Sequence, residues 1–114
     1  MHELSIVMGI VDIAEKEAKK AGVSSFDVIE LDIGKLSGIV MEALDFAWDS
    51  AVGGTVLEEA ERKINRIEAV SKCTRCGHEF VCETLYDACP ACGDYFTQMI
   101  QGNELKIKSL EYKT

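Results

Sequence analysis

Apolar residues recur at helical spacing in the first part of the chain. Between residues 4 and 21 they fill one wide face, while polar residues form a stripe that advances by three or four positions. The members of this stripe are Ser5, Gly9, Asp12, Lys16 and the pair Lys19/Lys20. The two lysines suit the negative end of a helix dipole, and Gly22 follows as a C-cap. The pattern predicts a helix over residues 4–21.

The period changes to two after residue 25. Residues 26–36 alternate polar and apolar side chains around Ile29, Leu31 and Ile33, which predicts a half-buried strand that ends before Gly38. A second helix is predicted over residues 40–52. The residues that share its apolar face are Leu44, Ala47, Trp48 and Ala51.

The alternation is weaker in the second half of the chain. Residues 55–70 predict one strand or a bent pair of strands. Residues 95–100 and 104–112 flank Gln101-Gly102-Asn103 and predict a hairpin. The expected fold is α+β, with two helices on one face of a small sheet. We expect one domain from residues 1–71 and 95–114, with a small module, residues 72–94, inserted between its last strands.

Four of the five cysteines form two Cys-x-x-Cys pairs, each followed by glycine. They are Cys73, Cys76, Cys89 and Cys92. Two such turns can close a tetrahedral shell, so the spacing predicts a structural Zn(II) site. The alternative is a pair of redox motifs, but a redox motif usually stands alone at a helix N-terminus. Zinc ligation, on the order of 10–16 kcal/mol in zinc peptides, would supply most of the module's stability.

The module contains two further residues with metal-binding side chains. Cys82 lies between the pairs on an expected short strand, where a small, partly buried residue is the simplest interpretation. His78 follows the first pair and could replace a cysteine as a ligand; otherwise it is a solvent-facing loop residue.

The charge of the chain narrows the classes of partner. The net charge is −8, most of it within residues 1–71, and no basic face is available to neutralise phosphates. We therefore expect no nucleic-acid partner. No apolar run is long enough for a membrane helix and no signal peptide is recognisable, so we expect a cytoplasmic protein with reduced thiols.

The N-terminus offers a second group of metal donors. The α-amine of Met1, the amide nitrogen of His2 and the His2 imidazole can lie in one plane around an ion, with Glu3 as a source of a fourth donor. Square-planar nitrogen coordination suits Cu(II) and Ni(II). From the residues alone a histidine near a chain end more often has no such role. No nucleophile motif, phosphate loop or histidine-rich catalytic site is present, so we expect no enzyme.

Short motifs follow one another across nearly the whole chain. They are Met1-His2-Glu3-Leu4-Ser5, Ile33-Gly34-Lys35-Leu36-Ser37-Gly38, Glu42-Ala43-Leu44 with Phe46, Cys73-x-x-Cys76-Gly77-His78 with Cys89-Pro90-x-Cys92-Gly93, and Gln101-Gly102-Asn103-Glu104-Leu105-Lys106-Ile107. In this order they resemble the HypA/HybF family, nickel metallochaperones for [NiFe]-hydrogenase maturation.

The resemblance implies roles for particular residues. His2 would be the nickel ligand, with Glu3 as an accessory donor or partner contact, and the four paired cysteines would hold zinc. It also implies a GTPase partner and delivery of Ni(II) to the hydrogenase large subunit; some relatives also serve urease. Cys82 departs from the family pattern, because a fifth thiol can compete for zinc or crosslink two chains into a homodimer.

Two functions remain open from the sequence. One is the nickel carrier, whose His2 must be neutral to bind, so its affinity should fall below roughly pH 6.5. The other is a zinc-ribbon adaptor that binds another protein and carries no nickel.

Overall fold

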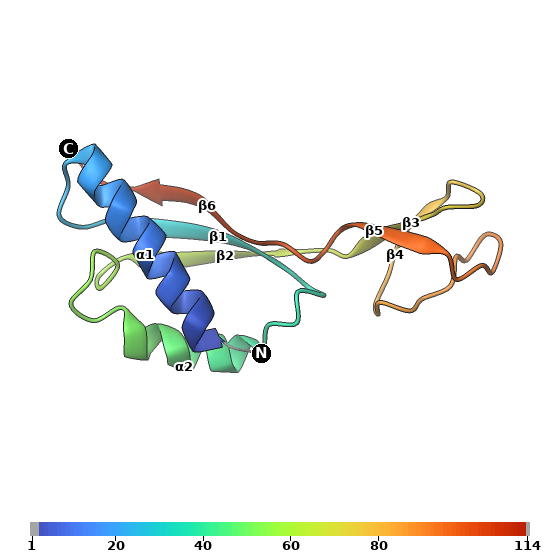
Figure 1. Ribbon diagram of the computed structural model, residues 1–114, viewed down its shortest axis with the longest axis horizontal. Helices are drawn as coiled ribbons and strands as arrows, with labels where there is room; N and C mark the ends of the chain where they lie inside the picture. Colours follow the sequence, from blue (N-terminus) through green and yellow to red (C-terminus); the bar gives the residue numbers. More distant parts are fainter. Residues whose placement is uncertain (1–2, 114) are drawn as a thin grey trace. The chain divides into compact units, whose positions relative to one another are not determined.

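The computed structural model describes residues 3–113, within which the chain forms two helices and six strands (Figure 1). In chain order they are α1 (Glu3–Ala21), β1 (Val28–Gly34), α2 (Met41–Ala51), β2 (Glu61–Ile67), β3 (Val70–Cys73), β4 (Glu79–Val81), β5 (Thr97–Gln101) and β6 (Leu105–Glu111). The α+β class is confirmed, and both predicted helices agree with the structure to within a residue at each end. Neither helix of this described part is long and apolar enough to cross a membrane.

Helix α1 ends as its sequence predicts. Gly22 adopts a positive φ of 70°, and the N–H of Val23 donates to the carbonyl of Ala18 at 3.0 Å. This bond spans five residues, as in a Schellman cap, where glycine avoids the steric cost that a Cβ brings to a left-handed residue. The buried side of the helix repeats at steps of three and four; its apolar residues are Val7, Ile10, Ala14 and Ala18.

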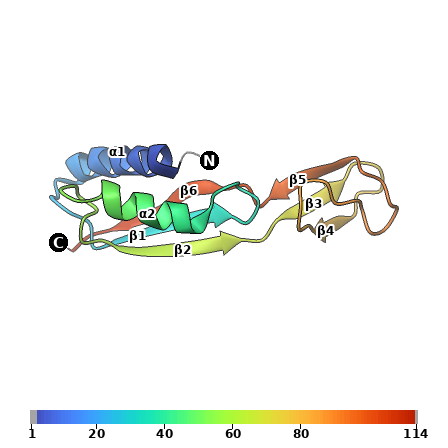
Figure 2. The same cartoon turned by 90° about the horizontal axis from the view of Figure 1, so that it is seen from below.

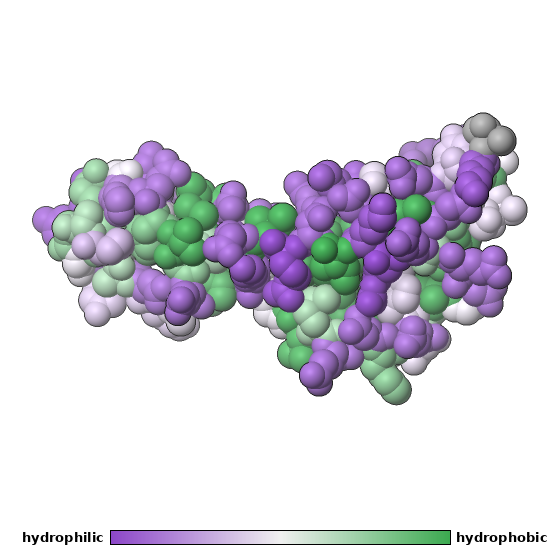
Figure 3. Space-filling view, turned by 180° about the vertical axis from the view of Figure 1, so that it is seen from behind, coloured by the Kyte–Doolittle hydropathy of each residue, from purple (hydrophilic) through white to green (hydrophobic). Residues whose placement is uncertain are grey.

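The first sheet has the strand order β2-β1-β6. On β1 the inward residues Ile29, Leu31 and Ile33 are fully buried, because α1 and α2 lie on the same side of this sheet (Figures 1 and 2). Figure 3 shows the face turned away from α1, where hydrophilic residues predominate. Glu30, which alternates with the buried residues of β1, lies 3.5 Å from the ammonium of Lys108. The sheet is therefore half-buried, as the alternation in β1 predicts.

Helix α2 packs through the side that its sequence marks as apolar. Leu44, Ala47 and Trp48 are buried. The guanidinium of Arg62 lies 5.2 Å from the centroid of the Trp48 ring and also pairs with Asp45. A cation over an indole face is a favourable contact, so β2 holds α2 through a polar residue as well as through the core.

The predicted strand over residues 55–70 is only partly correct. Residues 55–60 form successive turns in which the N–H groups of Glu58 and Ala60 donate to the carbonyls of Thr55 and Leu57. The adjacent residues Val56 and Leu57 are both buried, which a strand with one solvated face does not allow. Two strands, β2 and β3, then follow, so of the two alternatives predicted for residues 55–70 the structure agrees with the pair of strands.

The second sheet has the strand order β4-β3-β5, with both pairings antiparallel. Ser71 lies opposite Phe80 on one side and Met99 on the other, and a bulge at Val70/Ser71 shifts the register. The short strand expected to contain Cys82 is present as β4, but it ends one residue before this cysteine.

The predicted hairpin of residues 95–112 is wrong, because β5 and β6 belong to different sheets. Instead, the N–H groups of Gly34 and Leu36 donate to the carbonyls of Glu104 and Gly102, both at 2.8 Å. The segment after β5 thus accepts hydrogen bonds from the end of β1 and the residues that follow it, and the turn-rich composition here marks a close approach of two chain segments.

The chain divides into two compact units. The first contains residues 1–31, 39–64 and 107–114; the second contains residues 32–38 and 65–106. Residues 72–94, expected to form the zinc module, lie within the second unit, which also includes 32–38, 65–71 and 95–106.

Candidate metal centre

The two Cys-x-x-Cys segments fold into turns with the same hydrogen bonds. In the first, Gly77 donates to the carbonyl of Cys73 at 3.0 Å, and Cys73 donates to the carbonyl of His78 at 2.9 Å. In the second, Gly93 donates to Cys89 at 2.7 Å and Cys89 donates to Asp94 at 2.8 Å. Both glycines have a φ of 78°, so each pair needs glycine at the following position.

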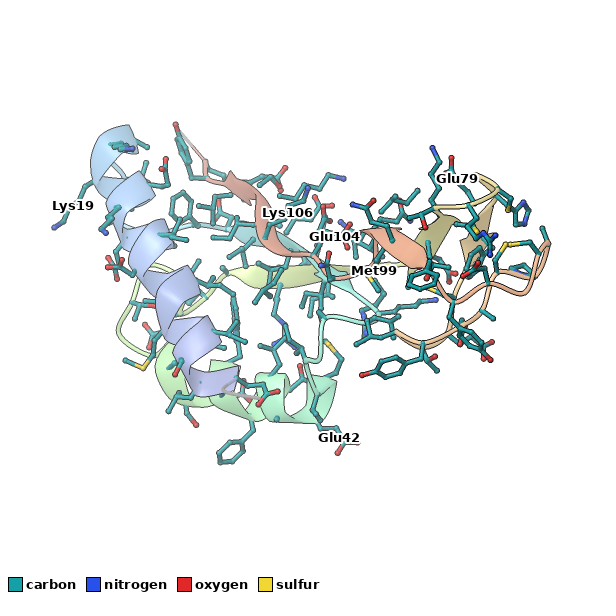
Figure 4. The ribbon with its side chains drawn as sticks, turned by 45° about the vertical axis from the view of Figure 1, so that its right-hand side comes forward. Lys19, Glu42, Glu79, Met99, Glu104 and Lys106 are labelled. Carbon is teal, nitrogen blue, oxygen red and sulfur yellow. The ribbon has the colours of Figure 1, made fainter. Side chains whose placement is uncertain are left out.

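These turns bring four thiols together, and Figure 4 shows sulfur atoms gathered in the part of the chain that carries Glu79. The cluster consists of Cys73, Cys76, Cys89 and Cys92, and their sulfur atoms all lie within 4.8 Å of one another. The Cys73 and Cys92 sulfurs are 3.5 Å apart, and those of Cys76 and Cys89 are 3.7 Å apart.

The donor set and its dimensions fit a tetrahedral zinc ion. A Zn–S bond of about 2.3 Å places tetrahedral sulfur ligands about 3.8 Å apart, close to the distances in this cluster. Cys73 and Cys89 are 1% exposed, whereas Cys76 and Cys92 reach the surface. Four thiolates fill the shell of such an ion and leave no position for a substrate, so this geometry suits a structural site.

The four thiols do not ionise alike. The pKa of Cys73 is lowered to about 7, mainly because the backbone N–H of Cys76 donates to its sulfur. At Cys92 the backbone N–H of Asp94 favours the thiolate, but the neighbouring Cys73 thiol and burial outweigh it and raise the pKa to about 12. A dication that binds all four sulfurs must therefore displace protons.

Two charged residues beside the cysteines, one in the first turn and one after the second, form an ion pair next to the cluster. Arg75 donates from Nη1 to Asp94 Oδ2 at 2.9 Å. The backbone N–H of Phe96 and then the Arg75 guanidinium hold the pKa of Asp94 below its ordinary range. The sequence predicts no role for Arg75 or Asp94, because their positions near the cysteines are the one feature that distinguishes them from other charged loop residues.

Cys82 and His78 lie outside this cluster. The Cys82 sulfur is 3.3 Å from the Ser71 hydroxyl and the residue is only 5% exposed. Its expected role as a small buried residue is confirmed, and competition with the paired cysteines for one ion is not supported by its position. His78 is exposed and its ring stacks on Phe80, with centroids 6.2 Å apart.

The N-terminal donors are described only in part. Met1 and His2 lie outside the described residues, so the nickel site expected at His2 stays a prediction. Glu3, the first residue of α1, is 7% exposed, and its Oε2 accepts a hydrogen bond from the backbone N–H of Val40 at 3.1 Å. One carboxylate oxygen of the expected accessory donor thus contacts the start of α2.

Comparisons with known proteins match this chain over nearly its full length. The family model described as "Hydrogenase/urease nickel incorporation, metallochaperone, hypA" matches residues 1–112. A hydrogenase maturation factor HypA from Parabacteroides distasonis is 41% identical over 113 residues, covering 99% of this chain and 98% of that protein. The corresponding protein of Geobacter metallireducens is 40% identical, with 97% and 98% covered.

Solved structures agree with the fold. The solution structure of the Ni metallochaperone HypA from Helicobacter pylori aligns with a TM-score of 0.71 at 26% identity, covering 97% of each chain. A second solution structure of a HypA protein aligns with a TM-score of 0.73 at 27% identity, covering 97% of this chain and 95% of the other. The fold, the four-thiol cluster and the family match lead to one conclusion: this chain belongs to the HypA family of nickel-incorporation metallochaperones, hydrogenase maturation factors.

Proposed function

We propose that this chain binds Ni(II) at its N-terminus and delivers it to the large subunit of a [NiFe]-hydrogenase, together with a GTPase maturation partner. The observation that carries the proposal is the family match, which runs from residue 1 to residue 112 and so includes the N-terminal Met-His-Glu. Urease is proposed as a second recipient class, because the same family description names it.

The nickel ligands proposed are the Met1 amine, the His2 amide nitrogen and the His2 imidazole. Three nitrogens in one plane suit Ni(II), which favours square-planar coordination by nitrogen and oxygen. Glu3 is proposed as the accessory donor. Its backbone nitrogen extends the chelate, whereas one of its carboxylate oxygens already accepts a hydrogen bond from Val40.

The four paired cysteines are proposed to hold Zn(II) and to fix the second unit. When bound, zinc supplies a structural crosslink between the two turns, and no step of nickel transfer passes through it. A carrier must release its cargo, and a chain end that offers few ligands can exchange them with a recipient site. A closed shell of four thiolates, two of them buried, is suited to retention instead.

Calorimetry with Ni(II) on zinc-loaded protein tests the proposal. We expect one nickel site in the wild type and its loss in His2→Ala. The matched control is His78→Ala, because the chain has only two histidines and His78 is exposed and outside the thiol cluster. Acetylation of the α-amine should weaken binding as well. Equal nickel binding by His2→Ala and wild type would contradict the site.

The zinc-ribbon adaptor is the other outcome of this experiment. A zinc-loaded wild-type chain that binds no nickel above pH 7 would favour it. Large apolar side chains in the second unit are exposed, which an adaptor would also need; they are Val81, Leu85, Tyr86, Tyr95, Phe96, Ile100 and Leu105. Their exposure alone does not distinguish an adaptor from a carrier, because a carrier also docks on its recipient.

A further inference from the structure

One ion pair joins the two turns that carry the cysteines. Arg75 lies inside the first turn, between Cys73 and Cys76, and Asp94 follows the second turn, two residues after Cys92. The contact of 2.9 Å between Arg75 Nη1 and Asp94 Oδ2 therefore connects the two halves of the four-thiol cluster, although the two residues are nineteen positions apart.

Asp94 is held firmly in place on its own side of the contact. Its side chain is 11% exposed, and its second carboxylate oxygen accepts a hydrogen bond from the backbone N–H of Phe96 at 2.9 Å. Its carbonyl oxygen accepts the N–H of Cys89 at 2.8 Å. Asp94 thus contacts both turns: its carbonyl oxygen binds Cys89 of the second turn, and its carboxylate binds Arg75 of the first.

Arg75 adds a positive charge beside the sulfur atoms. Its guanidinium is attracted electrostatically by Cys92 and Cys73 as well as by Asp94. Four thiolates around one dication leave a net charge of about −2, which a neighbouring cation stabilises. The side chain of Arg75 is 76% exposed, so its contribution to the stability of the whole fold should be small.

A second link runs alongside the ion pair. The backbone N–H and the hydroxyl of Thr74 both donate to the carbonyl of Phe96, at 2.9 and 2.7 Å. The first turn is thus attached to the segment after the second turn at two adjacent points. An ion leaving the cluster needs the turns to separate, and these links oppose that separation.

We propose that Arg75 and Asp94 form an outer clasp that slows the loss of the metal ion from the four-cysteine site. The two residues are positioning residues, since they touch the turns and the charge of the thiolates but supply no ligand. Outer contacts of this kind commonly change metal affinity by about 10- to 100-fold. The inference rests on the proposed zinc site and is independent of nickel binding.

The test measures zinc release from the full zinc-loaded chain into an excess of a chromophoric chelator. We expect Arg75→Gln and Asp94→Asn each to release zinc about tenfold faster than the wild type. The matched control is Lys35→Gln, which removes the exposed Lys35–Glu68 pair of the same unit, outside the four-cysteine cluster, and should leave the rate unchanged. Equal rates in Arg75→Gln, Asp94→Asn and the wild type would overturn the clasp.

Two further measurements separate the clasp from general loosening. The double variant, Arg75→Gln with Asp94→Asn, should release zinc no faster than the faster single variant, because the two residues act as one pair. Rate increases that multiply would overturn the pairing.

In Co(II)-loaded protein the thiolate-to-metal charge-transfer band should shift in Arg75→Gln and return toward wild type in Arg75→Lys, which restores the charge. An identical band in all three proteins would overturn the charge component. A wild-type chain that retains no zinc would instead overturn the zinc site itself.

Discussion

The carboxylate of Glu3 accepts a hydrogen bond from the backbone N–H of Val40 at 3.1 Å, which ties the first turn of α1 to the residue just before α2. Val40 is the N-cap of α2, and its own side chain makes no capping hydrogen bond. The positive end of a helix dipole favours a negative group, so a buried acid from another helix takes the place of a local cap.

Removing this carboxylate should destabilise the first unit. Hydrogen bonds to charged groups contribute about 1.5–3 kcal/mol, so Glu3→Ala should lower the free energy of unfolding of the zinc-loaded protein by about 2 kcal/mol. Urea denaturation measures this. The control Glu42→Ala removes an acid from the first turn of α2 that is exposed, and should cost much less. Equal losses in the two variants would contradict a capping role for Glu3.

The same residue separates stability from nickel binding. Glu3→Gln keeps the backbone nitrogen and a carbonyl oxygen that can accept from Val40 but loses the charge, so we expect a smaller loss of stability than in Glu3→Ala and a wild-type Ni(II) affinity. Calorimetry on zinc-loaded protein checks the affinity. A tenfold weaker nickel affinity in a stable Glu3→Gln protein would show that the carboxylate itself is a ligand.

Two glycines lie where three chain segments approach so closely that no side chain fits. A Cβ on Gly34 would lie 2.0 Å from the carbonyl oxygen of Gly102, and one on Gly102 would lie 2.4 Å from the Cα of Ala69. These neighbours are backbone atoms, which cannot swing away. Gly34→Ala should therefore cost at least about 3 kcal/mol of stability, at the upper end of overpacking effects.

A third glycine provides the control for this prediction. Gly9 lies on the exposed side of α1, does not have a positive φ, and has no atom beyond the adjoining backbone of its own helix within 4 Å of the position that a Cβ would take. Gly9→Ala should stabilise the protein by up to about 1 kcal/mol, because alanine favours helix. Thermal denaturation of both variants decides the point; a Gly34→Ala protein as stable as wild type would mean that this close approach can relax.

Local sequence patterns predict much of this architecture. The helices and β1 follow from periodicity, and the thiol cluster follows from spacing alone, because Cys-x-x-Cys-Gly encodes its own turn. The sheet assignments of β5 and β6 do not follow in this way. They depend on the close approach of Gly34, Ala69 and Gly102, which are far apart in the sequence.

The contact between Arg75 and Asp94 beside the cluster could not be predicted from the sequence either. Asp94 resembles any polar residue after a turn, and Arg75 resembles any charge in a loop. Their pairing across nineteen positions emerges only once both turns are in place. Local composition predicts which residues bind the ion but says little about the residues that hold those ligands together.

Zinc affinity should fall as the pH is lowered. Binding requires four thiolates, and at neutral pH Cys92, whose pKa is raised to about 12, must give up a proton to the solvent. Cys73, whose pKa is lowered to about 7, is already partly ionised at neutral pH. Below pH 7 it is mostly protonated, so zinc binding must displace a further proton from it. The logarithm of the zinc affinity should therefore rise with pH throughout, more steeply below about pH 7 than above it. Competition with a chelator at pH 6, 7 and 8 measures the slope, and an affinity independent of pH would contradict thiolate ligation.

The fifth cysteine should be dispensable for metal binding. Cys82 is buried beside Ser71 and lies outside the cluster, so Cys82→Ala should keep one zinc per chain and the cobalt spectrum of a four-thiolate site. Truncating a small buried side chain should cost roughly 1 kcal/mol of stability. Cys89→Ala, which removes a buried member of the cluster, is the contrasting variant and should lose tight zinc binding. If Cys82→Ala altered the zinc stoichiometry, Cys82 would have to be counted among the ligands, and the arrangement of the two turns around four sulfurs would need a fifth donor.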